Sequence, residues 1–436
     1  MLMGLPYWLF QMLRHGKYRA GLAERFGRVP ARLLAETSHE GGVSSGPRPT
    51  IWVHAVSVGE VLAVSGLVEE LKKRFPRHRV VVSSATDTGQ KLARKRFGEG
   101  DVFYFPVDFA FAIRPYLRAL RPELMVLAET EFWPNFLRLT RKSGARVAVV
   151  NARISDRSWP NYRRFRRGLK KMLMNVDLFL AQTETDALRL GVIGAEAERI
   201  QVSGNLKFDM ALPAAPPIVG SLRESLMASG AGPVLVCGST VDGEESLLLR
   251  AFENVLVAHP KAVMILAPRH PERFDEAAKL LQQTGVQFRR RSSWKNESLA
   301  GGVLLVDTIG ELAALYALAD LAFVGGSLVP RGGHNIIEPA LHGAAIVVGN
   351  HTENFRDIVS LFESRGAVRI VGPAELPLTW MELLANDEER KILGQRAAEA
   401  MQSQTGATRR TLDALALLMT KNEVVQSDAR QVATRQ

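Results

Sequence analysis

The stretch WVHAVSVGEV, residues 52–61, joins two hydrophobic patterns of different period. An apolar run ends at Val56, the segment Ser57–Glu60 breaks it, and apolar residues then return at helical spacing: Val61, Leu62, Val64, Leu67, Val68 and Leu71. The change of period predicts a strand, a tight turn containing Gly59, and a helix. Glu60 lies at this turn, either as an early-helix charge favoured by the helix dipole or as a functional carboxylate at a strand end.

The same alternation of short apolar runs and helical patterns continues along the first half of the chain. The helical patterns include 61–74 and 89–97. We expect strands at Ile51–Val56, Arg79–Ser83, Glu123–Leu127, Arg146–Val150, Leu178–Ala181 and Ile200–Val202. A βαβ rhythm of this kind predicts a parallel sheet with helices on both faces.

A second α/β half follows a segment that reads as a linker, Met210–Val219, which contains three prolines. Its expected strands are Val234–Val236, Val263–Ala267, Gly302–Val306, Leu321–Val324, Ile346–Val348 and Val368–Ile370. Because 436 residues exceed one ordinary core, we predict two Rossmann-like domains, residues 1–209 and 210–436. Their parallel sheets are expected to face a central, ligand-binding cleft.

The composition is that of a globular protein with an anionic partner. Apolar residues make up 46% and charged residues 23%, and the single cysteine, Cys237, excludes a disulfide framework. The net charge of +11 favours nucleic acid, an anionic membrane or a phosphorylated substrate. Seven basic residues and no acid lie between Arg157 and Lys171, and six basic residues and one acid lie between Arg14 and Arg32. A solvated helix face would produce the same pattern.

The N-terminal 13 residues, MLMGLPYWLFQML, are uncharged. A membrane span needs roughly 20 apolar residues, and a secretory signal needs a basic start and a cleavage site, so neither is expected. The segment either lies in the interface of an anionic leaflet or packs on the protein itself.

Glycine-rich and basic motifs mark the second half. In GGSLVPRGGHNIIEPALHGAAIVVGNHTENF, residues 325–355, the glycines permit close approach of a ligand, and Asn335 and Glu338 share one helix face. Glu338 is suited to accept hydrogen bonds from ribose hydroxyls, or else Asn335 caps the helix and Glu338 complements its dipole. In PRHPERF, Arg269 follows a strand and suits phosphate binding, whereas His270 has no identifiable partner.

Polar residues also end several strands of the first half. LAETEFWPN, residues 127–135, carries Glu129 and Glu131, and NARIS, residues 151–155, follows the next strand. GNLKFD, residues 204–209, places Lys207 just before the linker. The carboxyl ends of parallel strands share one edge of a sheet, so we expect these groups to lie together. The sequence has no Asp-x-Asp pair, zinc-type Cys/His cluster or Walker A motif, and no metal site or further cofactor is expected.

Together, HAVSVGE, ETEFWPN, NARIS, NLKFD, PRHPERF and GGSLVPRGGHN with HTENF resemble the 3-deoxy-D-manno-oct-2-ulosonic acid (Kdo) transferase family of lipopolysaccharide assembly, over roughly residues 18–371. The resemblance implies a GT-B fold, with the first domain binding the acceptor and the second a CMP-sugar. It implies metal-independent, inverting transfer of Kdo from CMP-Kdo to a phosphorylated lipid A precursor (lipid IVA). The place of action would be the cytoplasmic face of the inner membrane, where the protein would be peripheral or N-terminally anchored at the anionic surface.

Site residues are carried over from the family by motif. Glu60 would be the catalytic base, and Glu129 and Lys207 would support the transition state. The residues implied for CMP binding are Pro268, Arg269, Ile309, Gly310, Glu311, Asn335, Ile336, Ile337 and Glu338. The chain departs from the family where Ile336-Ile337 replaces Pro-Leu and Asn350 replaces proline.

Two other functions are compatible with parts of the sequence. A GT-B transferase or epimerase that uses a uridine nucleotide-sugar would share the two-domain rhythm. A nucleic-acid-binding module would use the basic clusters, but stacking aromatics are sparse there and no nucleic-acid motif is present. We therefore expect no nucleic-acid partner.

Overall fold

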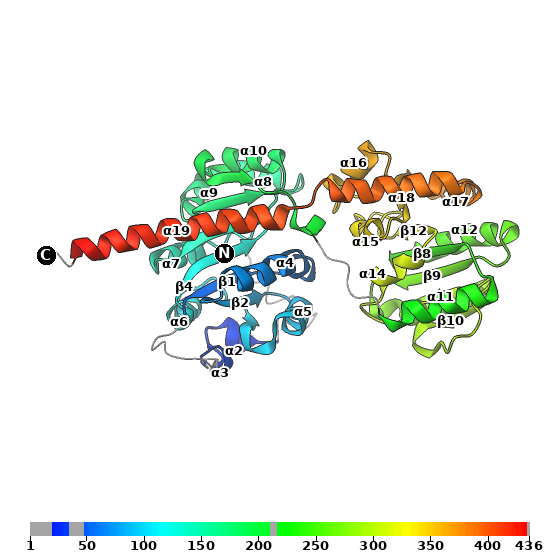
Figure 1. Ribbon diagram of the computed structural model, residues 1–436, viewed down its shortest axis with the longest axis horizontal. Helices are drawn as coiled ribbons and strands as arrows, with labels where there is room; N and C mark the ends of the chain where they lie inside the picture. The colour runs from blue at the N-terminus through cyan, green and yellow to red at the C-terminus, as the bar shows by residue number, and fades with distance from the viewer. Residues whose placement is uncertain (1–19, 35–47, 210–215, 434–436) are drawn as a thin grey trace. The chain divides into compact units, whose positions relative to one another are not determined.

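The computed structural model describes residues 20–34, 48–209 and 216–433. The chain divides into two compact units, which are described separately (Figure 1). Unit 1 comprises residues 1–210 and 404–436, and unit 2 comprises residues 211–403. The N-terminal apolar segment 1–13 and the first part of the predicted linker, 210–215, lie outside the described residues.

Unit 1 is built on a seven-stranded parallel sheet with the strand order β3-β2-β1-β4-β5-β6-β7. Its strands are β1 (Thr50–His54), β2 (Arg79–Ser84), β3 (Val102–Tyr104), β4 (Pro122–Ala128), β5 (Arg146–Ala152), β6 (Leu178–Ala181) and β7 (Ile200–Val202). Its helices are α2 (Leu22–Arg25), α3 (Ala31–Leu34), α4 (Val58–Arg74), α5 (Asp87–Phe97), α6 (Ala110–Leu120), α7 (Pro134–Lys142), α8 (Trp159–Arg164), α9 (Arg166–Leu173), α10 (Glu184–Ile193) and α19 (Ala407–Ala433).

Helices cover both faces of this sheet because its strands are apolar on both sides. In β1, Trp52 joins a core with residues of α6, α7, α9 and α10. Its neighbours Ile51 and Val53 point to the opposite face and pack with residues of α4, α5 and α19. Successive strand residues alternate between faces, and a strand buried on both faces reads as a continuous apolar run. This arrangement confirms the predicted α/β class.

Unit 2 repeats the architecture with the strand order β10-β11-β9-β8-β12-β13-β14. Its strands are β8 (Val234–Thr240), β9 (Val263–Pro268), β10 (Phe288–Arg290), β11 (Val303–Leu305), β12 (Leu321–Val324), β13 (Ala345–Gly349) and β14 (Arg369–Val371). Its helices are α11 (Pro217–Ser229), α12 (Glu245–Ala258), α13 (Phe274–Thr284), α14 (Leu312–Leu315), α15 (Ile337–Leu341), α16 (Arg356–Ser364), α17 (Leu376–Ala385) and α18 (Asp387–Gln402).

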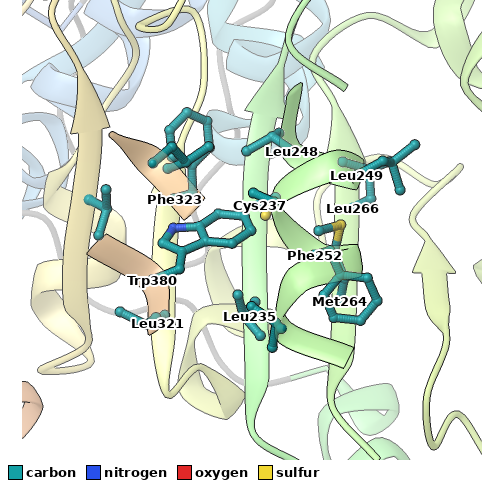
Figure 2. Packing of buried hydrophobic residues seen from close by; sticks show 14 of the residues in the cluster. Leu235, Cys237, Leu248, Leu249, Phe252, Met264, Leu266, Leu321, Phe323 and Trp380 are labelled. Carbon is teal, nitrogen blue, oxygen red and sulfur yellow. The ribbon is translucent and has the colours of Figure 1, made fainter. Parts of the chain in front are cut away.

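One face of the second sheet packs on an aliphatic and aromatic core (Figure 2). Phe252 on α12 and Trp380 on α17 are buried there with Cys237 of β8 and Phe323 of β12. The ring centroids of Phe323 and Trp380 are 6.5 Å apart in an edge-to-face arrangement, a geometry that aromatic pairs favour.

Each sheet has one strand that the sequence pattern does not predict. Both strands, β3 and β10, have three residues and lie at an edge of their sheet. An edge strand pairs on one side only, so its sequence needs no long apolar run. In β10, Phe288 is followed by Arg289 and Arg290, which hides the strand from a search for apolar segments.

The C-terminal helix α19 corrects the predicted boundary of the second domain. We expected residues 210–436 to form that domain, but residues 404–436 belong to unit 1. Ala407, Leu415 and Met419 of α19 are buried with the α4 face of the first sheet, and Figure 1 shows α19 running along this unit. An amphipathic pattern indicates that a helix buries one face, but not which sheet it covers.

In the described part of the chain, no helix is both long enough and apolar enough to cross a membrane.

We predict that truncating Phe252 destabilises unit 2. Phe252 is fully buried in its core, so Phe252→Ala should lower the free energy of unfolding by about 3–5 kcal/mol through lost burial and a residual cavity. Urea denaturation followed by circular dichroism measures the loss. Val257→Ala is the matched control, because Val257 lies on the same helix and is 84% exposed. Equal effects of the two substitutions would contradict the assigned core.

Candidate active site

The Glu60 carboxyl is held at the turn between β1 and α4. Ser57 is the N-cap of α4, and its hydroxyl donates a hydrogen bond to Glu60 Oε1 (2.9 Å). The backbone N–H of Val56 donates to Glu60 Oε2 (2.8 Å). The side chains of Ser84, the last residue of β2, and of Thr86, just after it, donate to the carbonyl of Val56 at 3.0 and 3.1 Å. The turn that carries the carboxylate is therefore braced from the neighbouring strand.

The environment of Glu60 opposes its ionisation. The residue is only 8% exposed, and burial raises the pKa of its carboxyl to about 7. The negative charge of Glu129, and to a smaller extent that of Glu131, acts in the same direction, while the hydrogen bonds from Val56 and Ser57 lower the pKa. A carboxyl with a pKa near neutrality exchanges protons readily at physiological pH.

Glu129 follows β4, the strand beside β1. Its backbone lies in the left-handed region, with φ of 56°, a conformation that non-glycine residues adopt at a cost. The N–H of Glu129 donates to the carbonyl of Val150 in β5 (2.9 Å). Nearby Glu131 accepts a hydrogen bond from the indole of Trp133 (3.1 Å), and burial raises the pKa of the Glu131 carboxyl. Both acids therefore lie at the edge of the sheet that carries Glu60.

Lys207 reaches the Glu129 carboxylate from a segment later in the chain. Its ammonium Nζ lies 3.7 Å from Glu129 Oε1. Lys207 belongs to the short 3-10 helix η3 (Leu206–Asp209). The backbone N–H of Leu206 donates to Asn151 Oδ1 at the end of β5 (3.0 Å). Asn151 itself adopts a positive φ of 54°, so its strained backbone coincides with the attachment point for η3.

The C-terminal helix secures η3 from its other end. Asp209 accepts hydrogen bonds from the backbone N–H groups of Gly406 (2.6 Å) and Thr408, at the start of α19. The Arg410 guanidinium donates to the carbonyl of Ser203 (2.8 Å). Lys207 is thus positioned by a helix that begins about two hundred residues later, a contact with no signal in the sequence.

These groups lie where the strand order of the first sheet reverses. In the order β3-β2-β1-β4, connections leave in opposite directions from β1 and β4, which are the strands preceding Glu60 and Glu129. Ligands of open α/β sheets bind outside the carboxyl ends of the strands at such a switch point. The structure therefore brings together the three predicted catalytic residues of unit 1 at the position that the fold favours for a ligand.

In unit 2, Arg269 extends from the carboxyl end of β9. Its neighbour Pro268 is buried, while the Arg269 side chain is exposed. The N–H of Arg269 donates to the carbonyl of Thr240 at the end of β8 (2.9 Å). The positive charge of Arg269 lowers the pKa of Glu338, although burial is the larger effect and raises it. The charge also helps to lower the pKa of His334, which burial brings to about 4.

The segment Asn335–Glu338 begins the short helix α15. Asn335 Oδ1 accepts a hydrogen bond from the N–H of Ile337 (3.2 Å). The N-cap position of α15 is Ile336, and no side-chain cap hydrogen bond forms there, so the helix-cap interpretation of Asn335 is wrong. The Ile336 and Ile337 side chains are buried, so only their backbone atoms remain for a ligand.

The turn at Ile309–Glu311 follows β11. Ile309 is 80% exposed and Gly310 has φ of 91°. The Glu311 carboxylate forms an ion pair with Arg291 (2.7 Å) and accepts a hydrogen bond from Thr308. At this turn the Ile309 side chain and the backbone are available to a ligand, whereas the Glu311 carboxylate is already bound by Arg291 and Thr308.

A buried carboxylate that the sequence analysis did not select organises the glycine-rich loop. Glu244 is fully buried and accepts hydrogen bonds from four backbone N–H groups. The donors, at 2.7–3.0 Å, are Val241, Gly326, Ser327 and Leu328. A Cβ on Gly325 would come within 2.6 Å of the Ser239 carbonyl oxygen. Gly325 is therefore required by close packing against the residues that end β8. The signal for Glu244 in the sequence was the motif GSTVDGEE, residues 238–245, a glycine turn after a strand. A motif of this kind does not indicate that the Glu244 side chain is buried.

Among the described residues, no group of three His, Cys, Asp or Glu side chains is placed to hold a metal ion.

Comparison with known proteins identifies relatives along nearly the whole chain. Residues 20–210 match the family model described as 3-deoxy-D-manno-octulosonic-acid transferase (Kdo transferase). The 3-deoxy-D-manno-octulosonic acid transferase of Haemophilus influenzae is 33% identical over 410 residues, which cover 93% of each chain. The enzyme of the same name from Bordetella pertussis is 37% identical over 423 residues, covering 94% of each chain.

Solved structures share the fold at low identity. The UDP-GlcNAc 2-epimerase from Neisseria meningitidis matches with a TM-score of 0.57 and 13% identity, covering 84% of this chain and 99% of that one. At this identity the likeness concerns the fold alone. The fold class is GT-B, with two Rossmann-like domains.

We predict that titration of the Glu60 carboxyl makes the folded chain less stable as the pH rises. Its folded-state pKa of about 7 exceeds the ordinary value of 4.5, so the folded chain holds an extra proton between these values and loses stability as pH rises through them. Glu60→Gln should therefore be more stable relative to the parent at pH 8 than at pH 5, by up to about 3 kcal/mol. Urea unfolding at both pH values measures the difference.

The control for this comparison is Glu69→Gln, an exposed glutamate on the same helix. Its stability difference from the parent should be the same at both pH values. A difference for Glu60→Gln that does not change with pH would contradict the raised pKa.

Proposed function

The chain belongs to the 3-deoxy-D-manno-octulosonic acid (Kdo) transferase family, a family of glycosyltransferases, and on this premise we propose that it transfers Kdo from CMP-Kdo to a phosphorylated lipid A precursor. The reaction would serve lipopolysaccharide synthesis at the cytoplasmic face of the inner membrane, with the protein attached peripherally. The observation that carries the proposal is the buried Glu60, with a pKa of about 7, beside the Glu129–Lys207 ion pair.

Glu60 acts as the general base in the proposed reaction. The acceptor hydroxyl gives its proton to a Glu60 oxygen while its own oxygen attacks the anomeric carbon of Kdo. Each Glu60 oxygen already accepts one hydrogen bond, and a carboxylate oxygen has a second lone pair for the incoming proton. A base whose pKa is near the working pH is deprotonated in much of the protein and is still basic enough to take the acceptor's proton.

The leaving group departs as CMP. As the new bond forms, the bond between the anomeric carbon and the phosphate oxygen breaks, and CMP takes the electron pair. A single displacement of this kind inverts the anomeric configuration. Lys207, paired with Glu129 at 3.7 Å, supplies positive charge for the developing anion, as electrostatic stabilisation requires.

The donor nucleotide is assigned to unit 2. Arg269 is exposed at a strand end and has no ion-pair partner among the described residues, so its guanidinium suits the single phosphate of CMP. Asn335 and Glu338 are assigned to the ribose, and the turn Ile309-Gly310-Glu311 to the base. Pro268 and the backbone of Ile336 and Ile337 complete the proposed site. No additional cofactor or metal enters the mechanism.

A transfer assay tests the function directly. The full chain is incubated with CMP-Kdo and a tetraacylated lipid A precursor, and mass spectrometry counts the sugars added. We expect Kdo addition by the parent, and a 10²- to 10⁴-fold lower kcat for Glu60→Gln because general-base catalysis contributes that factor. CMP affinity should be unchanged. Glu69→Gln is the matched control. The absence of transfer by the parent would refute the function, and full turnover by Glu60→Gln would refute the base.

Nucleotide protection tests the donor assignment. CMP should raise the melting temperature of the parent, and UDP should not. Arg269→Ala should weaken CMP binding by roughly 10- to 100-fold, because a hydrogen bond to a charged group is lost. Arg250→Ala, an exposed arginine on α12 of the same unit, should leave CMP protection unchanged. Stabilisation by UDP but not by CMP would favour a uridine nucleotide-sugar instead.

A further inference from the structure

An open groove of about 1000 Å³ lies on unit 1, around α8 and α9. Four arginines line it with apolar residues of the same segment. The arginines are Arg163, Arg164, Arg166 and Arg167, and the apolar residues include Phe165 and Leu169. The catalytic residues proposed above do not line this groove, so its chemistry needs a separate explanation.

The four arginines have no acidic partner. All four side chains are exposed, and none forms an ion pair within the described part of the chain. Elsewhere in unit 1, Arg141 and Arg146 both pair with Asp177. A cluster of like charges without counter-charge costs free energy by self-repulsion and creates a positive potential that attracts anions. Guanidinium groups in particular match the geometry of phosphate oxygens.

Hydrocarbon surface lies directly beside these charges. Phe165 is 64% exposed, and the Arg164 guanidinium carbon lies 5.9 Å from its ring centroid. Leu169 and Met172 add partly buried apolar surface to the groove wall. Exposed apolar residues next to basic ones suit an amphiphile that carries an anionic group close to hydrocarbon chains. A nucleic acid would use the charges but not this aliphatic wall.

The groove adjoins the loop that carries Glu129 and Glu131. Tyr162 on α8 contacts Phe132 of that loop. Its ring meets the ring of Phe132 edge to face, with centroids 6.2 Å apart. The helix that contributes Arg163 and Arg164 to the groove is therefore attached to the segment that holds the proposed transition-state carboxylate.

We propose that this groove is the acceptor subsite for phosphate: its arginines bind a phosphate of the lipid acceptor, and Phe165, Leu169 and Met172 contact the adjoining part of an acyl chain. The inference rests on the proposed function and names the surface by which the acceptor is selected. The occupant is the phosphorylated acceptor itself, and the headgroups of the surrounding bilayer are the alternative that the test distinguishes.

Binding and kinetic measurements on arginine variants test the subsite. The double variant Arg164→Gln/Arg167→Gln alters exposed side chains only, so it should fold normally. Its dissociation constant for a detergent-dispersed, tetraacylated, bisphosphorylated glucosamine disaccharide should rise at least tenfold, as should its KM for this acceptor. The KM for CMP-Kdo should stay within twofold. With the same acceptor after phosphatase treatment, parent and variant should bind equally.

The matched control is Arg114→Gln/Arg118→Gln, which removes two exposed arginines of α6 outside the groove. It should leave acceptor binding unchanged. Equal loss in both double variants would overturn the subsite, because net charge alone would then explain the effect. Unchanged acceptor binding by the groove variant would also overturn it.

A vesicle-binding measurement distinguishes binding of the acceptor from binding of the bilayer. Parent and groove variant are compared for binding to phosphatidylglycerol vesicles that contain no acceptor. If the variant loses vesicle binding yet keeps parental acceptor affinity in detergent, the groove is a bilayer-docking surface and the proposal is wrong. Because acceptor affinity is measured directly, a parent that binds acceptor through the groove but transfers no Kdo would refute the proposed function and leave the subsite standing.

Discussion

Burial of the Glu60 carboxyl is the constraint on which the chemistry of unit 1 depends. A carboxylate taken out of water beside other carboxylates prefers to be neutral. The turn opposes this preference with two hydrogen bonds, from Val56 and Ser57. Because burial outweighs these bonds without overwhelming them, the pKa settles at about 7. Less burial would lower this pKa, and loss of the two hydrogen bonds would raise it.

The same contacts make Glu60 both part of a helix cap and the candidate base. Ser57 caps α4 and donates to the Glu60 carboxyl, so the start of the helix and the orientation of the carboxylate form one feature. The side chains of Ser84 and Thr86 hold the turn through the Val56 carbonyl. The two interpretations of Glu60 from the sequence, an early-helix charge favoured by the dipole and a functional carboxylate, are therefore compatible. Burial of the Glu60 carboxyl costs stability, and such a cost is common where a residue is held for function.

Support for Lys207 comes from parts of the chain far apart in sequence. Asn151 at the end of β5 binds the start of η3, and Asp209 at its end binds the start of α19. Lys207 lies between these two attachments, next to Glu129. In unit 2, the buried Glu244 has a comparable role, since it gathers the backbone of the glycine-rich loop. In both units, polar groups of the scaffold hold the loops that carry the candidate ligand contacts.

The amino-acid sequence by itself determined the α/β class, most strands, and the placement of Glu60 and Glu129 at one edge of a parallel sheet, because hydrophobic period is a local property and parallel strands share a direction. The contacts that hold Lys207 beside Glu129 were decided by the tertiary structure. The sequence did not reveal the short edge strands β3 and β10, or the sheet that α19 covers, since an amphipathic helix fits either. The raised pKa of Glu60 and the burial of Ile336 and Ile337 were decided by the tertiary structure alone. Solvent exclusion depends on which distant segments pack around a residue, and no local pattern records that.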